Sequence, residues 1–307
     1  MVAKLLIYKI LQLFCMMLIG VVVAKLKIVT SKESSVLSKI SLYLLMPSAI
    51  INAFDFEQTP QMRTGLLFAF GAALLLHILL YLLDWLYGRF VSKNAVERAS
   101  VMYSNAGNLI IPIVSFALGE EWVVFSTAFM AVQLVFVWSH GIRLFSANEA
   151  FHIKKVLLNV NIIAIMIGLV LTVFGLRLPV FVKDITSSFG GMLGPVSMLI
   201  AGILAADINP KQVLADKRIY RVVALRTLVY PVITGVVLKL LSQLPVVDGD
   251  KILLIAFLAC ITPAAATVTQ LAQLNHKEPE FATAINIFST VVCVATMPLF
   301  VAVFTAF

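Results

Sequence analysis

The sequence has few charged side chains and few cysteines. Only 12% of its 307 residues are Asp, Glu, Lys or Arg, about half the share of a typical soluble domain. A chain with so little charge cannot cover itself with an ordinary water-facing surface, which excludes a cytoplasmic enzyme and a nucleic-acid-binding module. The three cysteines, Cys15, Cys260 and Cys293, are odd in number and lie in apolar runs. A disulfide framework and a CxxC metal pair are therefore excluded as well.

The motifs of membrane-embedded enzymes are also missing. A zinc protease needs H-E-x-x-H, but none of the four histidines has a neighbouring glutamate. An intramembrane serine protease needs G-x-S-x, which does not occur in the chain. No stretch between the apolar runs exceeds about 15 residues, so there is no soluble domain to carry a separate activity. We therefore expect no enzymatic activity, no cofactor and no metal site.

The sequence is instead rich in long apolar runs. Hydrophobic residues make up 61% of the chain and the mean hydropathy is +1.04. Because a helix needs about 20 apolar residues to cross a bilayer, the chain is predicted to be an all-α polytopic membrane protein with ten transmembrane helices. The expected helices cover residues 5–24, 36–54, 66–87, 99–118, 122–145, 156–175, 189–206, 219–241, 252–271 and 281–304.

The basic residues are unevenly distributed between the two sides of this arrangement. Fifteen of the 23 Lys and Arg residues lie in or beside the loops that follow odd-numbered helices, and seven lie on the opposite side. Loops rich in Lys and Arg normally stay inside, so we expect a multi-pass protein of the plasma membrane with both termini outside. The net charge of +8 is then explained by orientation in the lipid bilayer, and no nucleic-acid partner is expected.

Two pairs of similar segments indicate an internal repeat. Residues 125–128 (FSTA) and 281–284 (FATA) are separated by 156 positions, and Pro47 and Pro195 lie in the second and seventh expected helices. The chain is therefore read as two five-helix repeats, residues 1–145 and 146–307. Five is an odd number, so the second repeat enters the membrane from the opposite side. Inverted repeats of this kind are typical of secondary transporters, whose substrate site lies near the midplane at discontinuous helices.

The fourth and ninth expected helices carry residues that disrupt a helix. Residues 103–108 (YSNAGN) precede Pro112 in the fourth helix, and residues 260–267 (CITPAAAT) contain Pro263 in the ninth. Proline removes a backbone hydrogen bond and Gly107 relaxes the backbone. A break leaves the N–H groups of the following half-helix free at its positive end, which suits a carboxylate. The alternative is a simple proline kink packed against neighbouring helices.

At these residues the sequence resembles the bacterial branch of the auxin efflux carrier family. Residues 105–112 (NAGNLIIP) are similar to its N-x-G-x-x-G-x-P pattern, residues 44–49 (LLMPSA) to its L-x-x-P-A pattern, and residues 159–161 (NVN) to an Asn-Pro-Asn start of the sixth helix. Val160 and Ile110 depart from that pattern. Ser104 stands where plant auxin exporters have a proline.

The resemblance implies a mechanism and a class of substrate. Helices 1, 2, 6 and 7 are expected to form a scaffold and a homodimer interface. Helices 3–5 and 8–10 are expected to form a mobile, elevator-like transport domain in which helices 4 and 9 cross at the site. The implied substrate is a small organic anion such as malate or malonate, and auxin itself is not a safe inference.

Several polar and helix-breaking residues are candidates for this site. Asn105 is the strongest, because an amide can donate to a carboxylate, although it could instead cap the second half-helix. The threonines could bond their own helix backbone, and Asn159 and Asn161 could cap the sixth helix. The candidate substrate-binding residues are Asn105, Gly107, Asn108, Asn159, Asn161, Thr262, Pro263, Ala264 and Thr267, with Pro112 and Pro263 as helix breakers.

Three ionisable residues inside expected helices are candidates for charge coupling. Arg226 and Asp84 could pair with each other, or Arg226 could neutralise the substrate; snorkelling of both to the inner surface is the alternative. His77 could relay protons or be a satisfied core residue.

Two other functions remain open from the sequence. A sodium-coupled organic anion symporter of the bile-acid transporter type has the same ten-helix design, but sodium would need clustered oxygen ligands near the breaks. A membrane sensor that binds a ligand without moving it would need an output partner.

Overall fold

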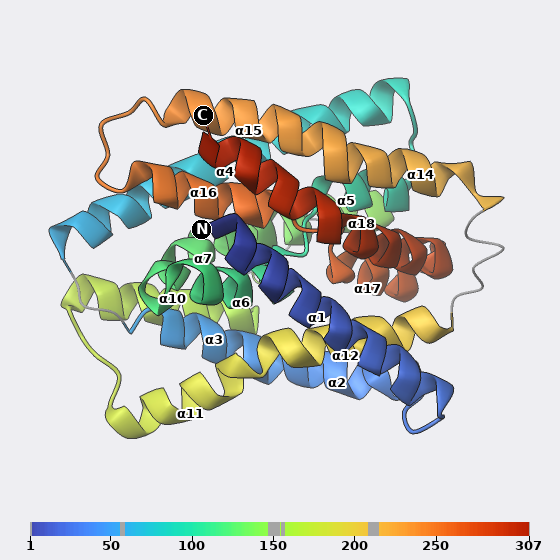
Figure 1. Cartoon of the computed structure of the whole chain (residues 1–307), viewed down its shortest axis with the longest axis horizontal. Helices are drawn as coiled ribbons and strands as arrows, with labels where there is room; N and C mark the ends of the chain where they lie inside the picture. Colours follow the sequence, from blue (N-terminus) through green and yellow to red (C-terminus); the bar gives the residue numbers. More distant parts are fainter. Residues whose placement is uncertain (1, 56–58, 147–153, 155–156, 208–214, 307) are drawn as a thin grey trace.

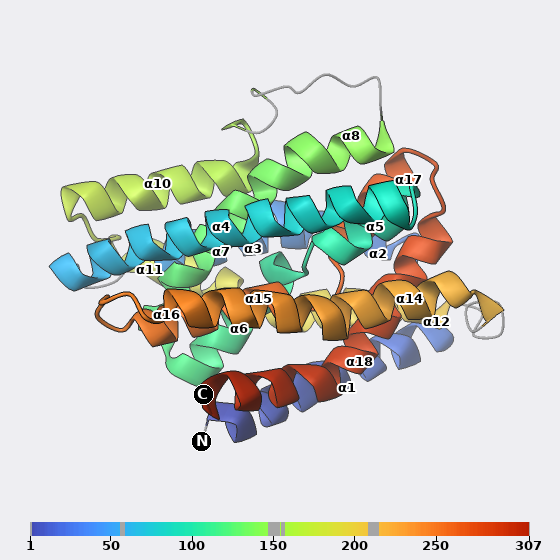
Figure 2. The same cartoon turned by 90° about the horizontal axis from the view of Figure 1, so that it is seen from above.

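The computed structural model describes residues 2–55, 59–146, 154, 157–207 and 215–306, and over these residues it contains helices and no strand. The helices run roughly along one common direction, and both chain ends lie toward the same end of the bundle (Figures 1 and 2). Val156, the predicted start of the sixth helix, lies outside the described residues. Six helical stretches are long and apolar enough to cross a membrane: Ser34–Ala53, Pro60–Phe90, Glu120–Phe145, Val180–Ala206, Lys217–Leu241 and Pro279–Ala306.

In the described part of its first half, the chain forms helical segments, several of them made of consecutive elements. In order they are α1 (Val2–Lys25); α2 (Ser34–Ile40), η1 (Ser41–Leu45) and α3 (Met46–Ala53); α4 (Pro60–Phe90); α5 (Ala95–Met102) and α6 (Ala106–Leu118); and η2 (Glu120–Trp122), α7 (Val123–Phe136), η3 (Val137–Gly141) and α8 (Ile142–Phe145).

The second half repeats this order. Its elements are α10 (Val160–Phe174); α11 (Val180–Gly191) and α12 (Leu193–Ala206); α14 (Lys217–Ala224), η4 (Leu225–Val229) and α15 (Tyr230–Leu241); α16 (Gly249–Ile261) and α17 (Ala266–Leu274); and α18 (Pro279–Ala306). The stretch from α14 to α15 runs in the opposite direction to α4 (Figure 1).

Prolines explain two of the irregular turns. Pro47 follows the π-helical segment η1 and Pro231 follows the π-helical segment η4. A proline inside a helix clashes with the carbonyl four residues earlier, and a π-helical turn widens the backbone at that point. Pro112 does not break the helix as the sequence predicts. The helix α6 continues through it.

The seventh helix is longer than the sequence predicts. The sequence predicts this helix at 189–206, with Lys183 before it. In the structure Lys183 and Asp184 lie inside α11, which begins at Val180. The Nζ atom of Lys183 lies 2.8 Å from Oδ2 of Asp55, just after α3. The charged pair therefore ties the start of α11 to the end of α3, which the hydropathy of α11 alone does not reveal.

The helices pack in two groups. In the first helix group, α12 packs along α1 and α2, and α3 packs against α10 and α11. In the second helix group, α4 to α8 pack with α14 to α18. The groups meet where α1 and α12 contact α6 and α18, and where α3 and α10 contact α7.

Two glycines set the closest approach within the first helix group. A Cβ atom on Gly20 would overlap the carbonyl of Leu199, and one on Gly202 would overlap the carbonyl of Met17. Helices α1 and α12 therefore touch backbone to backbone.

Candidate functional site

The fourth and ninth helical segments are each interrupted, and the two interruptions lie against each other. The first runs from Tyr103 to Asn105, between α5 and α6, and the second from Thr262 to Ala265, between α16 and α17. The N–H of Asn105 donates to the carbonyl of Pro263 at 2.8 Å, and the N–H of Ala265 donates to the carbonyl of Tyr103 at 3.0 Å. The unwound backbone is thus paired in an antiparallel bridge centred on Ser104 and Ala264. We call residues 103–105 and 262–265 the paired breaks.

Side chains from α7 and α18 satisfy the backbone groups of Ser104 and Ala264, at the centre of the paired breaks. Gln133 Oε1 accepts from the N–H of Ser104 at 3.1 Å and from its hydroxyl at 2.7 Å, while Gln133 Nε2 donates to the Ser104 carbonyl at 2.8 Å. In the second half, Ser289 Oγ accepts from the N–H of Ala264 at 3.0 Å, and Asn286 Nδ2 donates to its carbonyl. Buried peptide groups left unpaired are costly, so these side chains keep both breaks open.

These clamping residues are not among the candidates predicted from the sequence. Gln133 and Ser289 are separated by 156 positions, the same offset as the repeated FSTA and FATA segments. Polar residues at that offset in otherwise apolar helices are the sequence signal that marks this pair.

Arg226 is buried and joins the carboxyl ends of two half-helices. Its Nε and Nη2 donate to the Thr262 carbonyl at 3.1 and 2.8 Å, Nη2 also donates to the Cys260 carbonyl, and Nη1 donates to the Val101 carbonyl at 3.2 Å. Its exposed fraction is 0%, so it does not snorkel to the surface. It also does not pair with Asp84, which binds Arg98. A cation at helix carboxyl ends offsets their negative partial charge.

The amino ends of α6 and α17 follow the paired breaks. Asn105 is the residue before α6, but its side chain does not cap the helix; its Oδ1 accepts from Asn108 Nδ2 at 3.2 Å. Gly107, Asn108 and Thr267 are half-buried in the first turns of α6 and α17. None of residues 103–109 or 262–270 is acidic, so no carboxylate of either segment offsets these positive helix ends.

The other polar candidates make local or structural contacts. Thr262 Oγ1 donates to the Ala259 carbonyl of its own helix at 3.0 Å. Asn159 Oδ1 caps α10 by accepting from the N–H of Asn161 at 2.9 Å, and Asn161 Nδ2 donates to the Leu42 carbonyl at 3.4 Å. The structure therefore gives Asn159 and Asn161 contacts with α10 and η1, away from the paired breaks.

The candidate histidine His77 lies in the core of the second helix group. Its Nδ1 lies 2.7 Å from the Ala73 carbonyl of its own helix, and its ring packs against Phe129 and Phe136. Within the described part of the chain its Nε2 has no hydrogen-bond partner.

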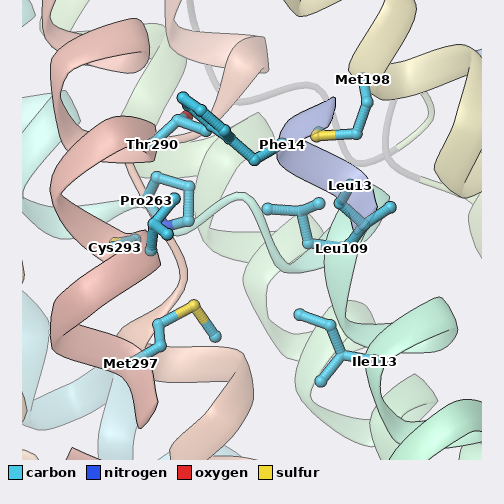
Figure 3. A pocket seen from close by; sticks show the side chains of 10 residues that line it. Leu13, Phe14, Leu109, Ile113, Met198, Pro263, Thr290, Cys293 and Met297 are labelled. Atoms are coloured by element: carbon cyan, nitrogen blue, oxygen red, sulfur yellow. The ribbon is translucent and has the colours of Figure 1, made fainter. Parts of the chain in front are cut away.

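Among the described residues, two cavities that bear on the paired breaks lie between the helix groups. A cavity of about 30 Å³ beside Pro263 is lined by apolar side chains of α1, α6, α12 and α18, among them Phe14, Leu109 and Met297 (Figure 3). It has room for about one water molecule. The second cavity, of about 420 Å³, lies between α3, α6 and α11 and is lined by polar and apolar residues that include Asn52, Pro112 and Ser115. It reaches Ile111, about one helical turn beyond Asn108.

Comparison with known families matches both halves of the chain to one family. The profile of the family described as membrane transport protein matches the chain twice, over residues 5–155 and over residues 149–301. A comparison with curated proteins finds no match.

Proposed function

Because the chain belongs to the membrane transport protein family, the auxin efflux carrier family that its motifs resemble, we propose that it is a secondary transporter that binds a small organic anion at the paired breaks. The double match confirms the predicted resemblance, and the protein is a multi-pass membrane protein with several apolar helices long enough to span a bilayer. The chemistry of the substrate is inferred from the charges around the paired breaks.

The observation that carries the anion proposal is a charge imbalance. Each helix end carries about half an elementary charge. The carboxyl ends of α5 and α16 together amount to about one negative charge, and the guanidinium of Arg226 balances it. The amino ends of α6 and α17 amount to about one positive charge without an acidic side chain in either adjoining segment. A carboxylate is the ligand that completes this balance.

The arrangement of Arg226 also argues against sodium coupling. The carbonyl oxygens of Val101, Cys260 and Thr262 are the clustered oxygens that a sodium ion would need beside the breaks. They accept hydrogen bonds from Arg226. We therefore expect anion uptake to be unchanged when choline replaces sodium.

The two helix groups support an elevator-type mechanism. The hydrogen bonds that hold the paired breaks all lie within the second helix group, whereas the contact of α1 and α12 with α6 and α18 is apolar around the smaller cavity. An apolar contact without shared polar networks allows sliding, whereas the hydrogen bond from Arg63 Nη2 of α4 to the Thr172 carbonyl of α10, at 3.2 Å, must break when the groups move. In this proposal the first helix group is a scaffold, the second carries the substrate, and the 420 Å³ cavity is the entry.

The same proposal includes the topology and assembly expected from the sequence. We propose ten spans in two inverted repeats, residues 1–145 and 146–307, with helices 4 and 9 crossing at the paired breaks. Both termini lie outside the plasma membrane, and a homodimer forms through the scaffold.

Uptake of labelled malate into proteoliposomes tests this function. The wild type is expected to accumulate malate, and Asn105→Ala is expected to lose most of that uptake. Asn275→Ala is the matched control, because the Asn275 side chain donates to the Leu271 carbonyl near the end of α17. Binding of malate without uptake would favour the sensor, and uptake that requires sodium would favour the symporter.

A further inference from the structure

A buried carboxylate in the second helix group contacts an arginine and a histidine. Arg98 binds Asp84 through both nitrogens, with Nε 3.0 Å from Oδ1 and Nη2 on Oδ2. On the same Oδ2, His140 Nε2 approaches to 3.2 Å. The side chain of Asp84 is 2% exposed, while those of Arg98 and His140 are 20% and 15% exposed. The Asp84 carboxylate is therefore shielded from water, whereas the His140 ring that contacts it is partly exposed.

The other nitrogen of His140 contacts the paired breaks. Nδ1 lies 2.9 Å from the hydroxyl of Tyr103, the first residue of the interruption between α5 and α6. The single hydrogen of that hydroxyl can go to the Phe136 carbonyl at 3.0 Å or to Nδ1. In the first case Nδ1 donates to the Tyr103 oxygen, and in the second it accepts from the hydroxyl.

The hydrogen bonds of this chain of side chains fit two states of His140 that differ by one proton. A carboxylate only accepts, so Nε2 carries a hydrogen toward Asp84 in both states. Nδ1 either donates to the Tyr103 oxygen or, without a hydrogen, accepts from the Tyr103 hydroxyl. Histidine is the side chain that changes its charge between about pH 5 and 8.

The titratable and charged groups around His140 come from α4, α5 and α15. Tyr81 of α4 meets the imidazole edge-on with ring centroids 5.0 Å apart. Asp84 of α4 and Arg98 of α5 offset each other, and Tyr103 and Tyr230 are neutral phenols near the same carboxylate. Arg98 stays bound to Asp84 in both states of His140, so a proton can leave the imidazole without leaving Asp84 unpaired.

We propose that Asp84 and His140 form a proton-binding site that moves with the substrate and reports its protonation to the paired breaks through Tyr103. The inference rests on the proposed function, because a proton can be coupled only to a transport cycle. When Nδ1 releases its proton to water, the Tyr103 hydroxyl turns its hydrogen from the Phe136 carbonyl to Nδ1, and no covalent bond other than Nδ1–H breaks. Tyr103 accepts the Ala265 hydrogen bond of the paired breaks, so this turn occurs at the edge of the anion site.

The π-helical segment η3 orients the His140 side chain toward Tyr103. His140 lies within η3, directly after Phe136 ends α7. A π-helical turn frees a carbonyl from its usual helical partner and redirects the side chains of that turn. The carbonyl of Phe136 accepts from Tyr103 at 3.0 Å and from Ser139 Oγ at 3.4 Å.

Malate exchange in proteoliposomes loaded with a pH-sensitive dye tests the site. Exchange of external for internal malate without a gradient tests the proposed function alone, and the change in internal pH that accompanies net malate entry tests the proton site. The wild type is expected to show both. His140→Gln is expected to keep exchange and lose the pH change, while His276→Gln, on an exposed turn, is expected to keep both.

A second measurement separates failure of this inference from failure of the proposed function. Nitrogen-15 NMR of labelled histidine in the substrate-free protein is expected to show a titrating imidazolium that His140→Gln removes. Malate exchange without proton movement in the wild type, or proton movement that survives His140→Gln, would overturn the proton site. If malate is not exchanged at all, the proposed function fails for malate, and a His140 ring holding one proton across about pH 5 to 8 would overturn the proton site independently.

Discussion

Arg226 shows what a single residue can contribute to a discontinuous helix pair. Its position inside the eighth helix follows from the sequence, but its partners do not, because the carbonyls lie 125, 36 and 34 positions away in the chain. From the sequence, Arg226 could pair with Asp84, neutralise the substrate or snorkel to the surface. In the structure Arg226 instead offsets the negative ends of α5 and α16.

Replacement of Arg226 is expected to unfold the paired breaks. Arg226→Leu leaves three buried carbonyls without their charged donor, which costs about 2–4 kcal/mol. Arg226→Lys keeps the charge but lacks the planar fork that spans both helix ends, so an intermediate loss is expected. Thermal unfolding in detergent measures both. Arg89→Leu, on the exposed end of α4, is the control, and an Arg226→Leu midpoint equal to that control contradicts the role of Arg226.

At the scale of elements, the two helix breaks could be predicted from the sequence, but the side chains that hold them open could not. Pro263 and the polar sequence 103–108 mark the interruptions because those residues disfavour a continuous helix. Gln133, Asn286 and Ser289 are ordinary polar residues in apolar helices, and their roles appear only when α7 and α18 lie beside the breaks.

The clamps of the two breaks are expected to differ in strength. Gln133→Leu leaves both the N–H and the carbonyl of Ser104 unpaired, and each buried unpaired group costs about 1–3 kcal/mol. Ser289→Ala leaves only the N–H of Ala264 unpaired. Gln133→Leu should therefore lower the unfolding midpoint more than Ser289→Ala. The reverse order would show that the clamp on Ser104 is not needed to hold the break.

The contact between α1 and α12 is expected to tolerate no added methyl group. Gly202→Ala places a Cβ on the Met17 carbonyl, and separating the two backbones costs about 1–3 kcal/mol. Gly71→Ala is a matched substitution in α4, where nothing lies within 4 Å of the added atom, and it should be neutral or stabilising by up to about 1 kcal/mol. Equal unfolding midpoints for the two variants would mean that α1 and α12 separate easily.

Acid stability of the whole molecule is expected to depend on Asp55. Burial raises the pKa of Asp55, but the hydrogen bonds from Lys183 and from the Leu178 N–H, with the charges of Lys183 and Arg177, outweigh it and hold the pKa below its ordinary value of 3.8. A depressed pKa stabilises the fold above the unfolded value, and this contribution is lost as the pH falls through the folded value. The wild-type unfolding midpoint should fall below about pH 4, and Asp55→Asn should lose part of that dependence. An unchanged acid profile in the variant would contradict this role.

For the whole molecule, the structural class and the order of the helical segments could be predicted from the sequence. Long apolar runs, the 156-residue offset and the helix breakers are local patterns, so they predict helices, a repeat and interruptions. The start of α11 at Val180, the continuity of α6 through Pro112 and the contacts of Asn159 and Asn161 depend on neighbours that are distant in the chain. The chemistry of the anion, the coupling ion and the dimer remain predictions.

Protection of a single cysteine measures the central claim, that an anion binds at the positive helix ends, most directly. Thr267→Cys is introduced into a Cys15→Ser background, because Cys15 is exposed and Cys260 and Cys293 are buried, and its rate of reaction with a polar thiol reagent is followed. We predict that malate slows the reaction and that its uncharged diamide does not. Transport of malate without any protection of residue 267 would contradict the account and locate the anion elsewhere.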